Sequence, residues 1–229
     1  MEQLTNFGDE RTLSFCAFCG GETGTRDHCP SRILLDDPFP SNLPVVPACL
    51  ACNNSFSADE EYFACLLACV IAGSTEPERV ARAKVQRLLI AKPALRSRIE
   101  KSRQTDGKKT LFIPEHDRIA TVVKKLARGH AMYELHEVLT DEPADLWFLP
   151  LETMQEHNRA DFEAPESSNV WPEVGSRAMQ RLVEGTDVTP QGWVDVQPGR
   201  YRYSAQLIDG IDVRFVVSEY LACKVRWEY

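Results

Sequence analysis

The spacing of apolar residues changes along the chain, and each spacing predicts a different kind of element. Residues 14–57 hold short apolar pieces between Cys, Gly, Pro and Asn, which is typical of turns and short strands. Between residues 58 and 135 apolar residues recur every three or four positions, which predicts amphipathic helices. From residue 145 onwards several runs alternate between apolar and polar, which predicts strands. We therefore expect an α+β protein that ends in an antiparallel sheet.

The helical middle divides into three predicted helices. The first covers residues 58–73, and the second extends from residue 77 to 104 with a break or kink at Pro93. The third covers residues 117–135 and contains Gly129. A glycine inside a helix costs up to about 1 kcal/mol relative to alanine, so its presence indicates close packing at that point.

The C-terminal region is predicted to contain several strands and one helix. Residues 145–151 ("DLWFLPL") form the first expected strand, a helix is expected near residues 176–184, and three or four strands follow. Asp209 and Gly210 stand between two alternating runs, which is a strong indication of a hairpin. We expect the helix to pack against an antiparallel sheet.

Four of the eight cysteines form two C-x-x-C pairs, Cys16 with Cys19 and Cys49 with Cys52, separated by residues 20–48. Two residues between ligands let both sulfur atoms reach one tetrahedral ion, so this layout predicts a structural zinc site with no open position. Metal binding is the better explanation than disulfides, because the N-terminus lacks the layout of a secretory signal. The other cysteines, which are Cys29, Cys65, Cys69 and Cys223, are expected to be packing residues.

Composition limits the classes of protein to which the chain can belong. Hydrophobic residues make up 43% of it, enough for a packed core, and no run of about 18 apolar residues suggests a membrane span. We expect a cytoplasmic protein with no membrane partner. The net charge is −8, but residues 61–130 carry 15 basic and 7 acidic groups, a local excess of +8. This basic middle fits either a polyanion-binding surface or, more simply, a solvated helix face.

An Asp27–His28 pair lies between the two cysteine pairs, in the stretch "TRDHCPSRILL". Alone, such a pair is usually a turn held by its own hydrogen bonds. Between two zinc knuckles it becomes a candidate for the centre of an active site. Histidine is the natural proton acceptor near neutral pH, and an adjacent carboxylate can hold a divalent ion, as phosphodiester hydrolysis requires.

The combination "CAFCG…RDHCPSR…SNLPVVPACLACNNSFSADEEYF" resembles the HNH endonuclease family, in its zinc-stapled ββα-metal form. The resemblance covers about residues 14–63. It implies a ββα finger clamped by both knuckles, with a helix that begins near Asn53. It also implies two domains, the finger at residues 1–63 and an α+β extension at residues 64–229 whose helices run to about residue 135.

The resemblance also implies roles for individual residues. His28 is then the general base, Asp27 a ligand of the catalytic ion, and Asn42 the residue that orients the base. Asn53 is the second ligand of the ion, where many relatives have histidine. A site of Asp and Asn oxygens favours Mg²⁺ or Mn²⁺ over a second zinc.

The expected partner is nucleic acid. Arg26 and Arg32 flank the pair and are candidate phosphate contacts, with an ordinary surface charge as the alternative. We expect a metal-dependent nuclease acting on DNA. A zinc-ribbon module that binds nucleic acid without cleaving it, and an RNA nuclease that uses the same site, remain open alternatives. The sequence does not indicate the oligomeric state.

Overall fold

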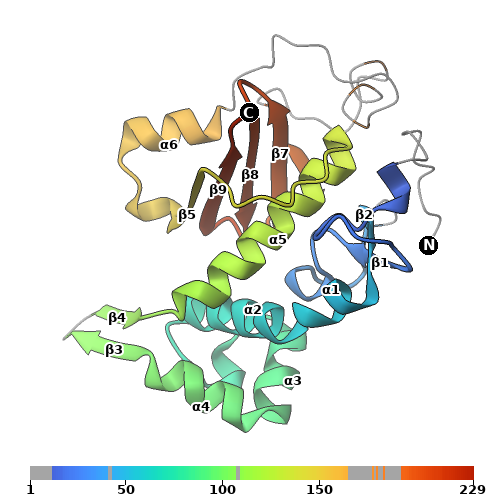
Figure 1. Cartoon of the computed structure of the whole chain (residues 1–229). Helices are drawn as coiled ribbons and strands as arrows, with labels where there is room; N and C mark the ends of the chain where they lie inside the picture. The colour runs from blue at the N-terminus through green and yellow to red at the C-terminus, as the bar shows by residue number, and fades with distance from the viewer. Residues whose placement is uncertain are drawn as a thin grey trace. The chain divides into compact units, whose positions relative to one another are not determined.

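The computed structural model describes residues 12–40, 43–106, 109–164, 177, 179, 183 and 192–229, and it shows a mixed α+β chain (Figure 1). The backbone forms two compact units. One joins Met1–Ser55 to Val123–Tyr229, and the other is Phe56–Val122. The expected domain border at residue 63 lies inside a helix, and residues 1–55 share a unit with the C-terminal sheet. Whether residues 1–63 act as a separate domain stays a prediction.

The elements follow the broad order predicted by the apolar spacing, which is short strands, then helices, then an antiparallel sheet. Two short strands also lie between the helices, and the helix at Glu156–Glu163 was not predicted. The α-helices of the described residues are α1 (Leu50–Ser55), α2 (Ser57–Ala72), α3 (Ala83–Ala91), α4 (Pro93–Lys101), α5 (His116–Leu135) and α6 (Glu156–Glu163). Single 3-10 turns are η1 (Thr12–Ser14), η2 (Arg32–Leu34), η3 (Pro77–Arg79) and η4 (Leu151–Thr153). The strands are β1 (Thr25–His28), β2 (Val45–Ala48), β3 (Arg103–Asp106), β4 (Lys109–Phe112), β5 (Asp145–Pro150), β6 (Val194–Gln197), β7 (Tyr201–Leu207), β8 (Ile211–Val217) and β9 (Leu221–Trp227).

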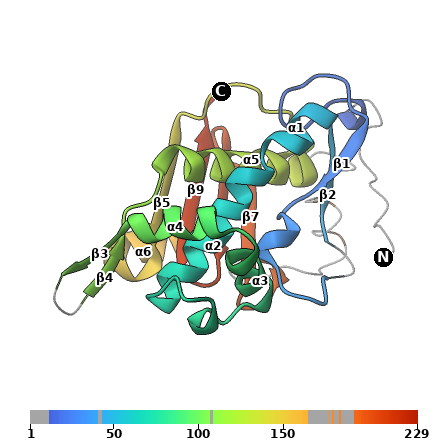
Figure 2. The ribbon, with the colours of Figure 1, turned by 90° about the horizontal axis from the view of Figure 1, so that it is seen from below.

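The N-terminal region is a two-stranded hairpin followed by a helix. Strands β1 and β2 pair antiparallel, from Thr25 opposite Ala48 to His28 opposite Val45. Helix α1 comes directly after β2 and lies beside the hairpin (Figures 1 and 2). The helix begins at Leu50 and not near Asn53, and it is interrupted at Phe56 before α2 continues.

The second unit holds α2, α3 and α4 with the β3–β4 hairpin (Figure 1). The break expected at Pro93 is confirmed, because α3 ends at Ala91 and Pro93 is the first residue of α4. Proline is suited to that position because its missing N–H would have no intrahelical partner there. Helix α2 ends at Ala72 and is capped by Gly73, whose φ of 61° is the left-handed conformation that glycine adopts without strain.

The C-terminal region is a five-stranded antiparallel sheet with the order β5-β9-β8-β7-β6. The predicted hairpin is confirmed, since Leu207 and Ile211 are paired on either side of Asp209 and Gly210. Both turn residues have positive φ, 46° and 121°. Of the helix expected near residues 176–184, the described residues are Arg177, Met179 and Val183, and these are helical.

Each face of this sheet is contacted by helical residues of the same unit. Tyr201 and Tyr203 of β7 contact His130 of α5 on one face. On the opposite face Phe162 of α6 packs with Val216 and other buried side chains. The core is therefore built in layers on the two sides of the strands. No helix in the described ranges is both long and apolar enough to cross a membrane.

Candidate functional site

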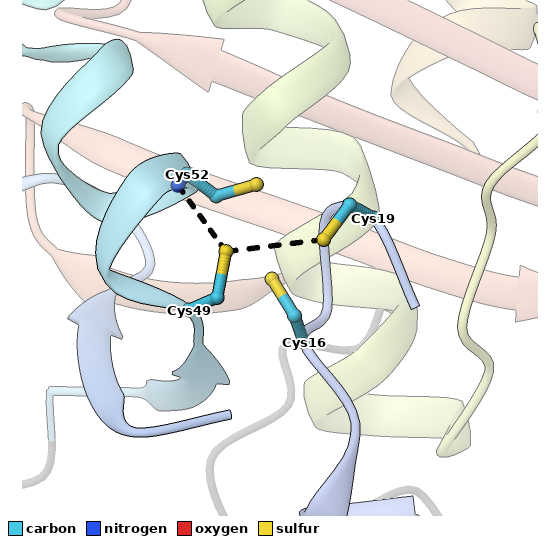
Figure 3. A group of neighbouring side chains, drawn as sticks. All are labelled: Cys16, Cys19, Cys49 and Cys52. Carbon is cyan, nitrogen blue, oxygen red and sulfur yellow. Dashed lines mark hydrogen bonds between the residues drawn. The ribbon is translucent and has the colours of Figure 1, made fainter. Parts of the chain in front are cut away.

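The two C-x-x-C pairs converge on one point (Figure 3). The sulfur atoms of Cys16, Cys19, Cys49 and Cys52 all lie within 4.8 Å of one another. The Sγ atoms of Cys19 and Cys49 are 3.9 Å apart. Tetrahedral coordination at a zinc–sulfur distance of about 2.3 Å places sulfur atoms about 3.8 Å apart. The cluster could therefore bind a structural metal such as zinc.

Backbone hydrogen bonds preform both knuckles. In the first, the Cys16 N–H donates to the Gly21 carbonyl at 2.7 Å and the Gly20 N–H donates to the Cys16 carbonyl at 2.9 Å. Gly20 has a φ of 71°, so a glycine is well suited to close this turn. In the second, the Cys52 N–H donates to the Cys49 sulfur at 3.3 Å.

That N–H···S bond affects the protonation of the second pair. The Cys52 amide stabilises the thiolate of Cys49 and lowers its pKa from 9.0 to about 7. Burial raises the pKa of Cys52, so this thiol keeps its proton unless a cation is present. A zinc ion provides such a cation, and four thiolates leave it no position for a substrate. The cluster is therefore suited to a structural role.

Asp27 lies in β1 and forms an ion pair with a lysine of α5. The Lys125 ammonium is 2.7 Å from Asp27 Oδ2, donates to the Ser31 hydroxyl at 3.0 Å, and lies 5.6 Å from the centre of the Phe18 ring. Only 1% of the Lys125 side chain and 14% of the Asp27 side chain are exposed. A buried ammonium thus already neutralises the carboxylate that was expected to bind the catalytic ion.

His28 is the last residue of β1 and is half-buried. Burial and the positive charges of Arg32 and Lys125 lower its pKa below 6.5, while Asp27 acts in the opposite direction. The imidazole is therefore neutral at pH 7, as a general base requires. Alternation along the strand turns the His28 side chain to the face opposite that of Asp27.

Asn53 of α1 is joined to β1. Its Nδ2 atom donates to Thr25 Oγ1 at 3.1 Å and to the Arg26 carbonyl at 3.2 Å. Thr25 and Asp27 are two residues apart and share a strand face, so Asn53 lies on the Asp27 side of β1. Its Oδ1 atom is the one that would bind a metal ion. Asn42 lies outside the described residues.

Arg26 and Arg32 are both exposed. Exposure is expected of phosphate contacts and equally of ordinary surface charges. The Arg32 guanidinium lies 5.3 Å from the centre of the Phe39 ring. These positions leave both interpretations of the two arginines open.

The remaining cysteines are packing residues, as predicted. Cys65, Cys69 and Cys223 are fully buried, and burial raises their pKa values, to about 12 for the first two. Cys29 is buried against α5, where a Cβ added at Gly129 would lie 2.6 Å from its sulfur. The close packing expected at Gly129 is thereby confirmed.

Several cations of the basic middle are paired within the helical unit. Three examples are Arg96 with Glu76 at 2.6 Å, Arg98 with Glu115 at 2.6 Å, and Arg118 with Asp59 at 2.5 Å; Lys92 pairs with Glu61 and Arg103 with Glu100 in the same way. Pairs of this kind are typical of a solvated helix face, each contributing about 0–1 kcal/mol. They favour the simpler interpretation of this charge run.

Sequence reasoning missed Lys125, the residue in direct contact with Asp27. A signal was present, because Val122, Lys125, Leu126 and Gly129 recur at helical spacing and place a lysine on an apolar stripe. A buried lysine nearly always has a partner. The pattern thus predicts a buried carboxylate nearby, although it does not identify Asp27.

Searches of protein-family models, curated proteins and solved structures found no match to this chain.

Proposed function

We propose that the chain is a metal-dependent nuclease of the HNH type, with DNA as its substrate. One observation carries this proposal, which is the arrangement of the N-terminal elements. Strands β1 and β2 pair, α1 follows them, and the four cysteines join the segment before β1 to the start of α1. This order agrees with a zinc-stapled ββα finger. The Asp27–His28 pair stands at the end of the first strand of that finger.

His28 is the proposed general base. Its lowered pKa keeps the ring neutral at physiological pH, ready to accept a proton from a water molecule that attacks the phosphate. Arg26 and Arg32 are exposed near this residue and would hold neighbouring phosphates of the substrate. Asn42 is assigned the role of orienting the base on the resemblance alone.

Asp27 Oδ1 and Asn53 Oδ1 are the proposed ligands of Mg²⁺ or Mn²⁺. Both are hard oxygen donors on one side of β1, and oxygen is the ligand atom that these ions prefer. The Lys125 ion pair occupies Asp27 Oδ2, so only one oxygen of this carboxylate remains. When bound, such an ion would polarise the phosphate and neutralise the departing oxygen.

A second candidate is a zinc finger that binds nucleic acid without cleaving it, and two observations favour it. The buried Lys125 ammonium takes the place of a cation beside Asp27, and strand alternation turns His28 away from the side that holds Asn53. In this case Lys125 serves as the counter-ion of Asp27 in place of a metal ion. An RNA nuclease would use the same residues as the DNA nuclease.

Incubation of the full chain with plasmid DNA and with RNA, in Mg²⁺, Mn²⁺ or EDTA, tests these candidates. We expect His28→Ala to lower the cleavage rate by about 10²–10⁴-fold, because a general base contributes that much. His157→Ala is the matched control, since His157 is exposed on α6. Zinc content and melting temperature should be unchanged in both variants.

The outcomes separate the candidates. Cleavage of DNA that needs a divalent ion and His28 supports the nuclease. Tight binding to DNA with no cleavage in any metal refutes the nuclease and supports the binding module. Cleavage of RNA alone identifies the third alternative.

A further inference from the structure

A pocket of about 460 Å³ lies on the face of the C-terminal sheet that α6 covers. Its walls come from β5, β8, β9 and α6, which are neighbours in Figure 1. Pockets that bind small molecules have volumes of about 300–1,000 Å³. The pocket contains no residue of the candidate nuclease site.

Strand register aligns three of its side chains in one row. Trp147 of β5 is paired with Lys224 of β9, and Lys224 is paired with Arg214 of β8. Paired residues on adjacent strands point to the same face, with strands about 4.8 Å apart. An indole ring, an ammonium and a guanidinium therefore stand side by side across the sheet.

One end of the row is apolar. The Trp147 ring is 5.5 Å from the Phe162 ring, measured between centroids, with the planes tilted by 53°. Met154 packs against the same cluster of side chains. Aromatic and thioether groups in this arrangement favour a flat apolar ligand.

The other end is positively charged and partly neutralised. Asp212 accepts from Arg214 Nε at 2.7 Å, and its other oxygen is 3.0 Å from Lys224 Nζ. Arg214 Nη1 donates to the carbonyls of Asp161 and Phe162 at 2.7 and 3.3 Å. Asp212 thus fixes the two cations beside each other.

Arg214 keeps donors that these contacts do not use. Guanidinium carries five N–H groups, and the bonds to Asp212, Asp161 and Phe162 account for those on Nε and Nη1. Within the described part of the chain no hydrogen bond is made by Nη2, and this atom is not one of the buried polar atoms that lack a partner, so it is open to solvent at the pocket. A guanidinium that is fixed by three hydrogen bonds and keeps one pair of donors open to a pocket is suited to an anion.

We infer that this pocket binds a small organic carboxylate that carries an aromatic ring. The ring lies against Trp147 and Phe162, and the carboxylate accepts from Arg214 Nη2 and Lys224. Asp212 cancels one of the two positive charges, and Asp161 at the wall adds a further negative group. A monoanion therefore fits better than a phosphate dianion.

Isothermal titration calorimetry on the full zinc-loaded chain tests this inference with three probes. Indole-3-propionate joins a ring to a carboxylate, tryptamine joins the same ring to an ammonium, and phenyl phosphate replaces the carboxylate by a dianion. We expect the carboxylate to bind at least about tenfold more tightly than either of the others, which corresponds to about 1.4 kcal/mol.

Substitutions test the two ends of the row. Lys224→Met and Trp147→Ala should each weaken binding of indole-3-propionate by about tenfold, since each removes a direct contact. Trp147→Phe should restore most of the affinity, because it keeps a ring. Lys101→Met, at an exposed lysine of α4, is the matched control and should have no effect.

Three results would overturn the inference. They are no binding of indole-3-propionate up to about 10 mM, equal or tighter binding of tryptamine, and equal or tighter binding of phenyl phosphate. Loss of affinity in Lys101→Met to the same degree as in Lys224→Met would show that the effect does not arise at the pocket.

Discussion

The N-terminal hairpin β1–β2 with helix α1, called the finger below, and the C-terminal sheet belong to one compact unit but are held together in different ways. Strands β7, β8 and β9 have seven residues each, and every residue of β8 is buried. Strands β1 and β2 have four residues each, and only Val46 and Ala48 among them are buried. The sheet can be stabilised by its own apolar surface, whereas the finger depends on side chains that join distant points of the chain.

This difference follows from composition. Burial of apolar area stabilises a fold by about 25 cal/mol per Å². The segment from Cys16 to Cys52 contains five prolines and three glycines, and its two strands bury only Val46 and Ala48. Four thiolates around one ion would add a cross-link that strands of this length do not supply. A region of this kind should respond sharply to loss of a single ligand, while the sheet should not respond at all.

The largest effect is expected from loss of the zinc site. Cys49→Ser, or removal of metal by a chelator, should unfold the finger, because structural zinc binding has an apparent free energy of about 10–16 kcal/mol at pH 7. Hydrogen exchange should show loss of protection in β1, β2 and α1, with β7–β9 still protected. Cys65→Ala removes a cysteine outside the cluster and serves as the control. Purified protein that lacks zinc but keeps a protected finger would contradict this.

Replacement of Lys125 is expected to have the second largest effect. Lys125→Met leaves the Asp27 carboxylate without its buried partner, which typically costs about 3–5 kcal/mol. Chemical denaturation measures the loss. Lys124→Met is the matched control, because Lys124 pairs with the exposed Glu142 at 2.7 Å and such pairs contribute about 0–1 kcal/mol. Equal effects of the two substitutions would show that the Asp27 pair is not buried in solution.

The sheet has its own weak point at the β7–β8 turn. Gly210 has a φ of 121°, and a Cβ there would lie 2.1 Å from the Trp227 carbonyl oxygen. Gly210→Ala should therefore destabilise the protein by about 3 kcal/mol, from overpacking and backbone strain. Gly199→Ala is the control, since Gly199 also has positive φ but no atom within 4 Å of the added Cβ. Its cost should be about 1 kcal/mol, from backbone strain alone.

The difference between the finger and the sheet also explains which features could be predicted from the sequence. Alternation and the Asp209–Gly210 pair predicted the strands and the hairpin of the sheet, because those signals are local. The C-x-x-C spacing predicted which four cysteines meet. The sequence did not predict the pairing of Lys125 with Asp27, because 97 residues separate them and only the fold brings them together. The pocket at Trp147 and Arg214 was missed for the same reason, since it depends on register across three strands.

A smaller effect is expected where the finger meets α5. Gly129→Ala places a Cβ 2.6 Å from the Cys29 sulfur, which should cost about 1–3 kcal/mol through overpacking. Cys29→Ala removes that sulfur, so the double variant should be less destabilised than the sum of the two single variants. A double-mutant cycle by chemical denaturation measures this coupling. Strict additivity would show that the two residues do not touch.

The smallest effect concerns the protonation of His28. Its pKa is lowered in the folded protein, chiefly by burial and by Arg32, so the unfolded chain takes up the proton first as the pH falls. The stability contributed by the neutral ring is present above pH 6.5 and is lost as the pH falls through 6.5 towards the lowered value. His28→Gln removes this dependence. The difference in unfolding free energy between wild type and His28→Gln should therefore change between about pH 7.5 and pH 5.5, with wild type losing more.

The comparison with His28→Gln cancels the acid sensitivity of the four-cysteine cluster, because both proteins contain it. If the chain is a nuclease, the acid limb of its rate profile should lie below pH 6.5, since the general base must be neutral. An NMR titration of the His28 ring gives the pKa directly. A value above 6.5 would mean that Asp27 acts on the ring more strongly than burial, Arg32 and Lys125 together.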